Sequence, residues 1–319
     1  MQKQSFEQIP YMYRPYDFPS QFPVLAFLGN YWKVDTSQPQ FFHFHNALEI
    51  GCCLSGKGSL FYKNAEEFSY EAGDYSIIFP HTPHITTAGQ EPASWEYLYI
   101  DPKQLLDTNS PYTSQLWQVF YMLQRVPPII NIIRRGEFSL LHYYLSRIFQ
   151  EFHEKKPLYQ NAVLGLLISF FAELNRITVN IEFADGSEKE GTYSYIRNAL
   201  SYIYENYNKP ISIKELSLYC CISESHFRRL FHSVVGISPL EYIQHYRIQQ
   251  ACHWLYLNQE PINVIAHKVG YNSLSSFNRQ FQQYMHISPT VWQKEHLSIP
   301  YKHEVLSYEE SDTRHIFKI

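Results

Sequence analysis

Apolar and polar positions in the last third of the chain follow one pattern twice, fifty residues apart. The segment Phe231–Pro239 (FHSVVGISP) is echoed by Phe281–Pro289 (FQQYMHISP). Ahead of each copy, a short apolar helical pattern is followed by a turn and by a second helix that carries Arg and small polar residues. The repeat predicts two helix-turn-helix units, which would present two reading helices to DNA.

The second helix of each unit has an inner and an outer face. Phenylalanines recur at helical spacing on the inner face, as Phe227 and Phe231 in one unit and Phe277 and Phe281 in the other. The outer faces carry polar residues, and an outward Arg or Asn can pair with the edge of guanine or adenine. A solvated face or a phosphate contact is the alternative role for each of them. The candidate DNA-binding residues are Ser225, Arg228, Arg229, Leu274, Ser275, Asn278 and Arg279.

The ends of these helices also have sequence signals. Ser223 and Asn272 are expected as N-caps, and Gly236 as the left-handed residue that ends the first reading helix. The stretch Pro239–Leu257 predicts one helix that joins the two units. At about 1.5 Å per residue it would be roughly 28 Å long, close to the roughly 34 Å of one DNA turn. Both reading helices could then enter successive major grooves.

The rest of the chain predicts a different architecture. Residues from about 20 to 100 are rich in Tyr, Phe, Val and Ile between Gly-centred turns, which indicates short strands in a small barrel or jelly roll. From about 112 to 176 apolar residues recur every three or four positions and predict helices. Phe183–Thr192 (FADGSEKEGT) is polar and predicts a linker before helix resumes at Tyr193, and Ser298–Ile319 forms a polar tail.

Composition adds a modest charge asymmetry. The formal net charge is −4, but Tyr193–Leu297 alone is +3, and a mildly basic module joined to an acidic one is typical of a DNA-binding regulator. The five cysteines are odd in number and form no C-x-x-C pair, which favours reduced, buried thiols. We find neither a signal-like segment at the N-terminus nor a stretch long enough for a membrane helix, so we expect a cytoplasmic protein with no membrane partner.

The C-terminal residues resemble the AraC/XylS family of bacterial transcription regulators. The matching segments are Tyr202–Tyr207, Pro210–Ser212, Arg247–Ala251, Ile265–Tyr271, Phe277–Phe281 and Ile287–Pro289. The resemblance covers about a hundred residues and implies a DNA-binding module that recruits or blocks RNA polymerase, with Arg247 as an internal brace. Ser217, His286 and Gln293 depart from the family's usual Ala, Gly and Arg, which affects helix ends and one phosphate contact more than the fold.

A second pattern lies near the N-terminus. His43, His45 and Glu49 form H-x-H-x-x-x-E, and they face one side if the strand continues; His84 follows a Gly-Asp turn and a strand. These residues resemble the two motifs of the cupin barrel, at the positions of its metal ligands. Three alternatives stay open: a divalent transition metal, a pocket for a sugar or similar polar molecule without metal, and a structural role. The expected ligand-binding set is His43, His45, Glu49, His84, Trp95 and Tyr97.

Together these patterns predict a multi-domain α and β protein with an N-terminal cupin-like β-barrel, a helical dimerisation linker and a C-terminal all-α double helix-turn-helix. The expected boundaries are 1–105 for the sensor, 106–182 for the dimerisation region, 193–297 for the DNA-binding domain and 298–319 for the tail. The favoured function is a ligand-responsive regulator, either an activator or a repressor, that acts as a homodimer on double-stranded DNA with no resident cofactor. The chain shows no catalytic triad or phosphate-binding loop, so we do not expect an enzyme. A regulator whose barrel only dimerises, and a metal-dependent cupin enzyme fused to a DNA-binding module, are the alternatives.

Overall fold

The computed structural model describes residues 11–19, 21–35, 42–62, 67–106, 130–183, 190–235 and 237–298. Its strands are β1 (Tyr11–Tyr13), β2 (Val24–Val34), β3 (Phe42–Phe44), β4 (Leu48–Ser55), β5 (Lys57–Tyr62), β6 (Glu67–Glu71), β7 (Tyr75–Ile78), β8 (His84–Ala88), β9 (Ala93–Ile100) and β10 (Ile132–Ile133). Its helices are α1 (Pro102–Leu105), α3 (Ser139–Glu154), α4 (Tyr159–Phe183), α5 (Glu190–Asn206), α6 (Ile213–Tyr219), α7 (Glu224–Val235), α8 (Pro239–Leu257), α9 (Ile262–Lys268), α10 (Leu274–Met285) and α11 (Pro289–Ser298).

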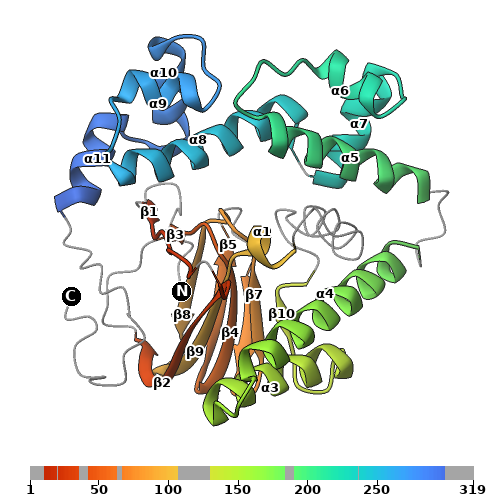
Figure 1. Ribbon diagram of the computed structural model, residues 1–319, viewed down its shortest axis with the longest axis vertical. Helices are drawn as coiled ribbons and strands as arrows, with labels where there is room; N and C mark the ends of the chain where they lie inside the picture. Colours follow the sequence, from red (N-terminus) through yellow and green to blue (C-terminus); the bar gives the residue numbers. More distant parts are fainter. Residues whose placement is uncertain are drawn as a thin grey trace.

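The strands form two five-stranded sheets, in the orders β1-β3-β8-β5-β6 and β10-β7-β4-β9-β2. Almost every side chain of β4, β7 and β9 is buried, because the second sheet is covered on both faces. Helices α3 and α4 pack on its outer face, where Leu141 and Leu145 join Ile50 and Leu98 in one apolar cluster (Figure 1). The expected cupin-like, sheet-rich N-terminal domain is confirmed.

Some expected element bounds are corrected. The helical pattern expected from 112 includes β10, a two-residue strand that pairs with β7. β1 lies before the expected strand region and adds to β3 in parallel. Helix α5 starts at Glu190, before the expected Tyr193. Most of the expected linker, Gly236 and nearly all of the polar tail lie outside the described residues.

Helices α5 to α11 form the expected all-α module, which lies across one end of the sheets (Figure 1). The repeated Ile-Ser-Pro explains two helix starts. Ser238 accepts a hydrogen bond from the Glu241 amide, and Ser288 accepts one from Val291, while the proline after each serine opens the helix. The single connecting helix Pro239–Leu257 is found as α8.

Two helix ends differ from expectation. α10 is capped by Ser273, whose Oγ accepts from the Ser276 amide at 3.2 Å, and not by Asn272. His286 ends α10 with φ of 62°, so histidine adopts the left-handed conformation that glycine would favour. Ser223 caps α7 as expected, with its Oγ 3.4 Å from the His226 amide.

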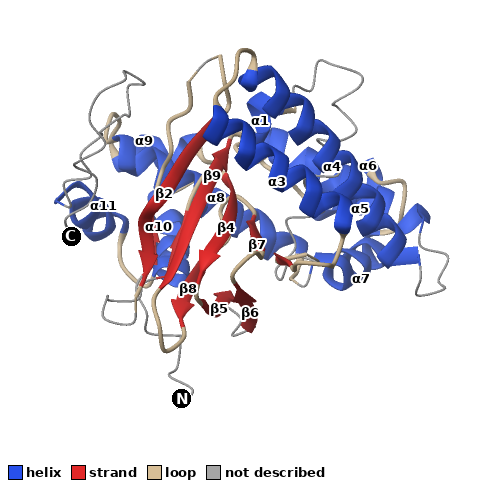
Figure 2. Cartoon of the chain, turned by 90° about the horizontal axis from the view of Figure 1, so that it is seen from below, coloured by secondary structure: helices blue, strands red, loops and turns tan. Residues whose placement is uncertain are grey.

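The two domains share apolar contacts. Tyr13 of β1 and Phe44 of β3 belong to the same buried cluster as residues of α8, α9, α10 and α11. The Tyr13 ring lies 5.1 Å from Phe44 and 6.3 Å from Trp292, and its hydroxyl lies 3.2 Å from Nδ1 of His253. In Figure 2 the module is again seen beside the sheets. The sensor therefore packs directly on the second helix-turn-helix unit.

Candidate functional site

A cluster of three histidines and one glutamate lies between the two sheets. His43 on β3 and His84 on β8 belong to one sheet, Glu49 on β4 belongs to the other, and His45 lies on the crossing between them. One ligand atom from each lies within 4.8 Å of all the others. His45, Glu49 and His84 are fully or almost fully buried, and His43 is half-buried. The expected convergence of these four side chains is found.

The route to that convergence differs from the one expected. Strand β3 ends at Phe44 and β4 begins at Leu48, so the histidines and Glu49 do not lie on one continuous strand. The chain instead crosses from one sheet to the other at residues 45–47. The pairing of β3 with β8 brings His84 to the cluster, because His43 lies directly opposite His84 in these two strands.

Backbone carbonyls fix the orientation of two imidazole rings. Nδ1 of His45 lies 2.9 Å from the oxygen of Ala47, and Nδ1 of His84 lies 2.9 Å from the oxygen of Thr82. A carbonyl oxygen only accepts, so each Nδ1 carries a proton. The Nε2 atoms of both rings then face the centre of the cluster, where Nε2 of His45 meets the Glu49 carboxylate. Nε2 of the neutral His84 ring keeps a lone pair, which a proton-donating group or a cation at that centre would complement.

The glutamate supplies the negative charge of the cluster. Oε2 of Glu49 lies 3.0 Å from Nε2 of His45 and 3.8 Å from Nε2 of His84. Burial alone would raise the pKa of Glu49, but the hydrogen bond from His45 and the nearby imidazoles outweigh it and lower the pKa. Burial lowers the pKa of His84 to about 4, although Glu49 acts in the opposite direction, and its Nε2 has no hydrogen-bond partner. His84 is therefore a neutral ring that offers a lone pair.

Tyrosines that the sequence did not single out lie closest to the cluster. The Tyr99 ring lies 5.4 Å from His45, and Tyr16 stacks on Tyr99 at 3.8 Å. Tyr97 is the next ring along β9, 6.2 Å from Tyr99, and Trp95 stacks on Tyr97 at 5.8 Å. The β4–β9 register pairs Glu49 with Tyr99 and Cys53 with Trp95, so Trp95 lies farther from Glu49. Strand alternation could have identified Tyr99, which shares a face with Tyr97.

A turn connects this cluster with α8. His81 has φ of 61°, and its amide donates to the carbonyl of His45 at 2.6 Å. The amide nitrogen of the Gln249 side chain donates to the carbonyl of His81 at 2.6 Å. Two backbone-anchored hydrogen bonds thus run from a cluster residue to the helix between the two DNA-binding units. No sequence signal pointed to Gln249.

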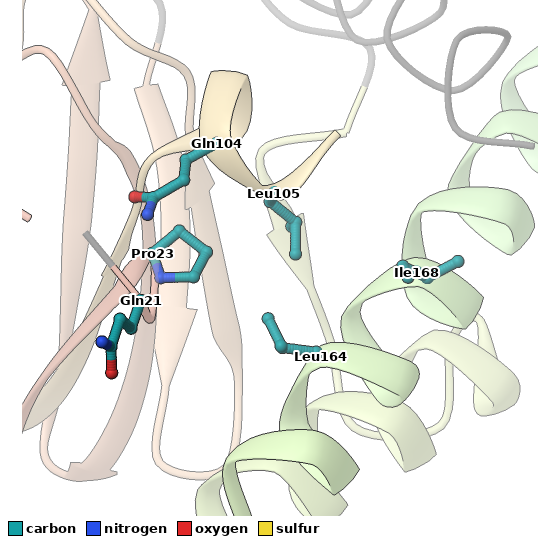
Figure 3. A pocket seen from close by; sticks show the side chains of 6 residues that line it. All are labelled: Gln21, Pro23, Gln104, Leu105, Leu164 and Ile168. Carbon is teal, nitrogen blue, oxygen red and sulfur yellow. The ribbon is translucent and has the colours of Figure 1, made fainter. Parts of the chain in front are cut away.

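The cavities given by the structure lie elsewhere. One of about 270 Å³ is open to solvent beside α1 and α4 and is lined by Gln21, Pro23, Gln104, Leu105, Leu164 and Ile168 (Figure 3). A second, of about 30 Å³, lies between the Pro80–Thr82 turn and α8, with Tyr242 and His245 in its lining. Neither is lined by the four cluster residues.

The cysteines fall outside the cluster. Burial raises the pKa of Cys52 and of Cys53 to about 12, so both are protonated thiols. Cys220 and Cys252 are buried as expected, but Cys221 is exposed in the turn of the first helix-turn-helix unit. Its φ of 56° places it in a left-handed turn rather than in the core.

The seven candidate DNA-binding residues lie on two exposed helix faces. Phe227 and Phe231 on α7, and Phe277 and Phe281 on α10, point into the core as expected. Ser225, Arg228, Arg229, Leu274, Ser275, Asn278 and Arg279 are all exposed. Arg247 instead donates to the carbonyls of Tyr207 and Lys209, each at 2.7 Å, which matches the expected internal brace.

Comparisons with known proteins agree with this arrangement. Residues 33–159 match the family described as AraC-like ligand binding domain, and residues 216–295 match the helix-turn-helix domain family. The raffinose operon transcriptional regulatory protein RafR of Pediococcus pentosaceus is 27% identical over 244 residues, which cover 75% of this chain and 82% of RafR. The regulator AlkR of Acinetobacter baylyi is 36% identical over 100 residues, which cover 31% of this chain and one third (33%) of AlkR.

The solved structures include ToxT of Vibrio cholerae O395, which superposes with a TM-score of 0.47 at 12% identity, over 85% of this chain and 97% of ToxT. Within the described part of the chain, no helix has the length and apolar character to cross a bilayer.

Two matched domains and a relative aligned along most of both chains lead to one conclusion. The chain has an AraC-like ligand-binding domain followed by a helix-turn-helix domain, and relatives that align with it are named as transcription regulators.

Proposed function

We propose that this protein is a sequence-specific regulator whose two reading helices, α7 and α10, bind adjacent major grooves under the control of a small molecule held between the sheets. The observation that supports this proposal most has two parts. Both helices expose polar faces, and the buried histidine–glutamate cluster is connected to α8, the helix between them. Double-stranded DNA is the first partner, and RNA polymerase and a second copy of the chain are the others that this function implies. The proposal involves no catalytic step, and the relative RafR is named as a regulatory protein.

The first candidate effector is a small neutral polar molecule such as a carbohydrate. His43, His45, His84 and Glu49 offer hydrogen-bond donors and acceptors, and the Tyr99 and Tyr16 rings offer a flat face on which a sugar ring can stack. RafR, a relative aligned along most of this chain, is named for the raffinose operon. His45, Glu49 and His84 are buried, so the rings around them must move apart to admit a sugar.

The second candidate occupant is a divalent transition metal ion. Three observations favour it: four ligand atoms within 4.8 Å, Nδ1 protons of His45 and His84 held by carbonyls so that both Nε2 atoms face inward, and a buried Nε2 of His84 without a hydrogen-bond partner. Three imidazoles and a carboxylate suit Zn²⁺, Fe²⁺, Ni²⁺ or Cu²⁺. His43, His45, Glu49 and His84 would hold the ion, which would act here as the effector or as a platform for it.

Either occupant would act through the contact with α8. Expansion at the cluster would shift His45, whose carbonyl holds His81, and His81 in turn holds Gln249. An effector changes DNA binding only through the difference in its affinity for two states of the protein. The two states proposed are one with the His81–Gln249 contact closed, as here, and one with it open.

Binding-site selection from a random duplex library with the full chain tests the DNA half of the proposal. We expect one recurring motif with two blocks. Arg279→Ala should weaken binding by about 1–3 kcal/mol and relax one base position. The control Arg176→Ala removes an exposed Arg on α4 and should change neither. Recovery of random sequence only would contradict the proposal.

Thermal unfolding of the full chain with added saccharides, and with Zn²⁺ or Ni²⁺ after chelator treatment, tests the effector half. A bound effector raises the unfolding temperature through mass action. The double variant Glu49→Gln, His84→Ala should lose that rise while it keeps binding to the selected motif. Metal analysis of the purified protein separates the two candidates. No stabilisation by either class, with metal-free protein, would exclude the cluster as the site for both.

A further inference from the structure

Arg228, a candidate base-contacting residue of α7, is held by a neighbour one turn earlier. Its Nε and Nη2 atoms donate to the same oxygen, Oε1 of Glu224, at 3.1 and 2.7 Å. Both side chains are about half exposed, 49% for Arg228 and 43% for Glu224. An exposed ion pair of this spacing contributes little to stability, so stability alone does not explain the contact.

The contact leaves Arg228 competent to read a base. A guanidinium has five N–H groups, and the pair with Glu224 takes the edge formed by Nε and Nη2. The other edge, formed by Nη1 and the remaining proton of Nη2, keeps two parallel donors. Guanine presents O6 and N7 to two such donors in the major groove. Glu224 therefore restricts the side chain to orientations in which only this fork is free.

The charge of Glu224 adds discrimination. A carboxylate at the start of a reading helix is repelled by phosphates and can accept only from an exposed amino group, such as N4 of cytosine. The second unit lacks this pair, because fifty residues later Leu274 and Asn278 occupy the matching positions. The two units thus differ at both positions that form this pair.

We infer that Glu224 is a specificity-determining residue of the first helix-turn-helix unit, which orients Arg228 for guanine and penalises other sequences. This inference rests on the proposed base contact of α7 and extends it to a residue that the sequence did not single out. Its chemical partner is a G·C pair in the block of the DNA site bound by α7.

The test compares Glu224→Gln, Arg228→Ala and the double variant in the full chain, on the duplex motif selected by the wild-type protein. Glu173→Gln is the control, because Glu173 forms an ion pair within α4 with the exposed Arg176, away from the reading helices. We expect Glu224→Gln to reduce the preference for guanine at one position by about tenfold, and to bind random duplex DNA more tightly at low salt. The double variant should lose no more preference than Arg228→Ala alone. The base preferences in the block bound by α10 should be unchanged.

The outcomes separate the inference from the function beneath it. A wild-type chain that selects no motif would remove the proposed function itself. If the wild-type protein selects a motif and Glu224→Gln binds it with the same base preference, only the inference about Glu224 is overturned. An equal loss of preference at both blocks also overturns it, because the change would then act on the whole module and not on Arg228.

Discussion

At the residue scale, Gly270 shows how tightly the DNA-binding module is built. It follows α9 with φ of 92°, and a Cβ at this position would lie 2.6 Å from the carbonyl oxygen of Tyr207 and 2.9 Å from Nε of Arg247. Arg247 itself holds the carbonyls of Tyr207 and Lys209. The absence of a side chain at Gly270 therefore lets α8, α9 and the end of α5 approach one another closely. Arg247 holds them together at this point.

Gly270→Ala should destabilise the full chain by about 1–3 kcal/mol, because alanine meets both left-handed strain and a backbone clash. Gly165→Ala is the matched control, since that glycine lies in α4 with nothing within 4 Å of an added Cβ. The control should be neutral or stabilising by up to about 1 kcal/mol. Denaturant unfolding measures both, and equal effects would show that the close approach at Gly270 is unimportant.

The candidate cluster was largely predictable from residues, but its surroundings were not. His43, His45, Glu49 and His84 have a spacing that strands bring together, and the structure does so. Tyr16 could not be predicted, because its stacking on Tyr99 depends on how the chain before β2 folds over the sheet. The alternation along β9 placed Tyr97 inside the sheets but gave no measure of how far Trp95 lies from Glu49.

At the element scale, helix ends were predictable where their signals are local. α8 has the expected bounds, since Ser238 and Pro239 open it and Asn258 adopts a left-handed conformation at its end. β10 was missed because two residues carry no periodicity, and it is a strand only through its pairing with β7. The crossing at residues 45–47 was missed because two short strands joined by a crossing show the same alternation of apolar and polar residues as one continuous strand.

The N-cap of α10 gives a test at this scale. Ser273 and Asn272 are adjacent and both are good capping residues, so the sequence alone does not distinguish them. Ser273→Ala should cost about 1 kcal/mol, because the Ser276 amide loses its partner. Asn272→Ala should change the free energy of unfolding by less than about 0.5 kcal/mol. Chemical denaturation measures the free energy of unfolding of both variants. A larger loss for Asn272→Ala than for Ser273→Ala would identify Asn272 as the cap.

At the scale of the whole molecule, the contact between domains rests on Tyr13. This side chain is 1% exposed and lies among rings of the sensor and of the second helix-turn-helix unit. Tyr13→Ala should cost about 3 kcal/mol and separate the unfolding of the two domains into distinct steps. Leu218→Ala, at an exposed position on α6, is the control and should leave the calorimetric profile unchanged. A single sharp transition in Tyr13→Ala would contradict a coupling role.

The homodimer was expected from apolar residues of the helical region, and most of these, though not Ile168, are buried within the chain. Leu141, Leu145, Ile148, Phe152 and Phe171 are buried within the chain, against the second sheet and between α3 and α4. The apolar side chains exposed on or beside these helices are Leu140, Tyr143, Leu158 and Ile168. The homodimer therefore stays a prediction, now assigned to the exposed set.

Sedimentation of the full chain tests this assignment. Leu145→Ala should lower stability by about 2–5 kcal/mol and leave the dimer intact, because it opens a cavity in the core. Leu140→Asp should dissociate the dimer with little loss of stability, since it places a charge at an exposed apolar position. A wild-type monomer, or dissociation by Leu145→Ala only, would contradict the assignment.

The continuity of α8 has a consequence for the genome that encodes this protein. One unbroken helix of 19 residues fixes the separation of the two reading helices. The target sites should then tolerate base changes within either block but not inserted or deleted base pairs between them, since each base pair turns the second block by about 36° around the duplex axis. A search of promoter regions should therefore use two short blocks at one constant centre-to-centre distance of about 10 base pairs, with no allowance for gaps.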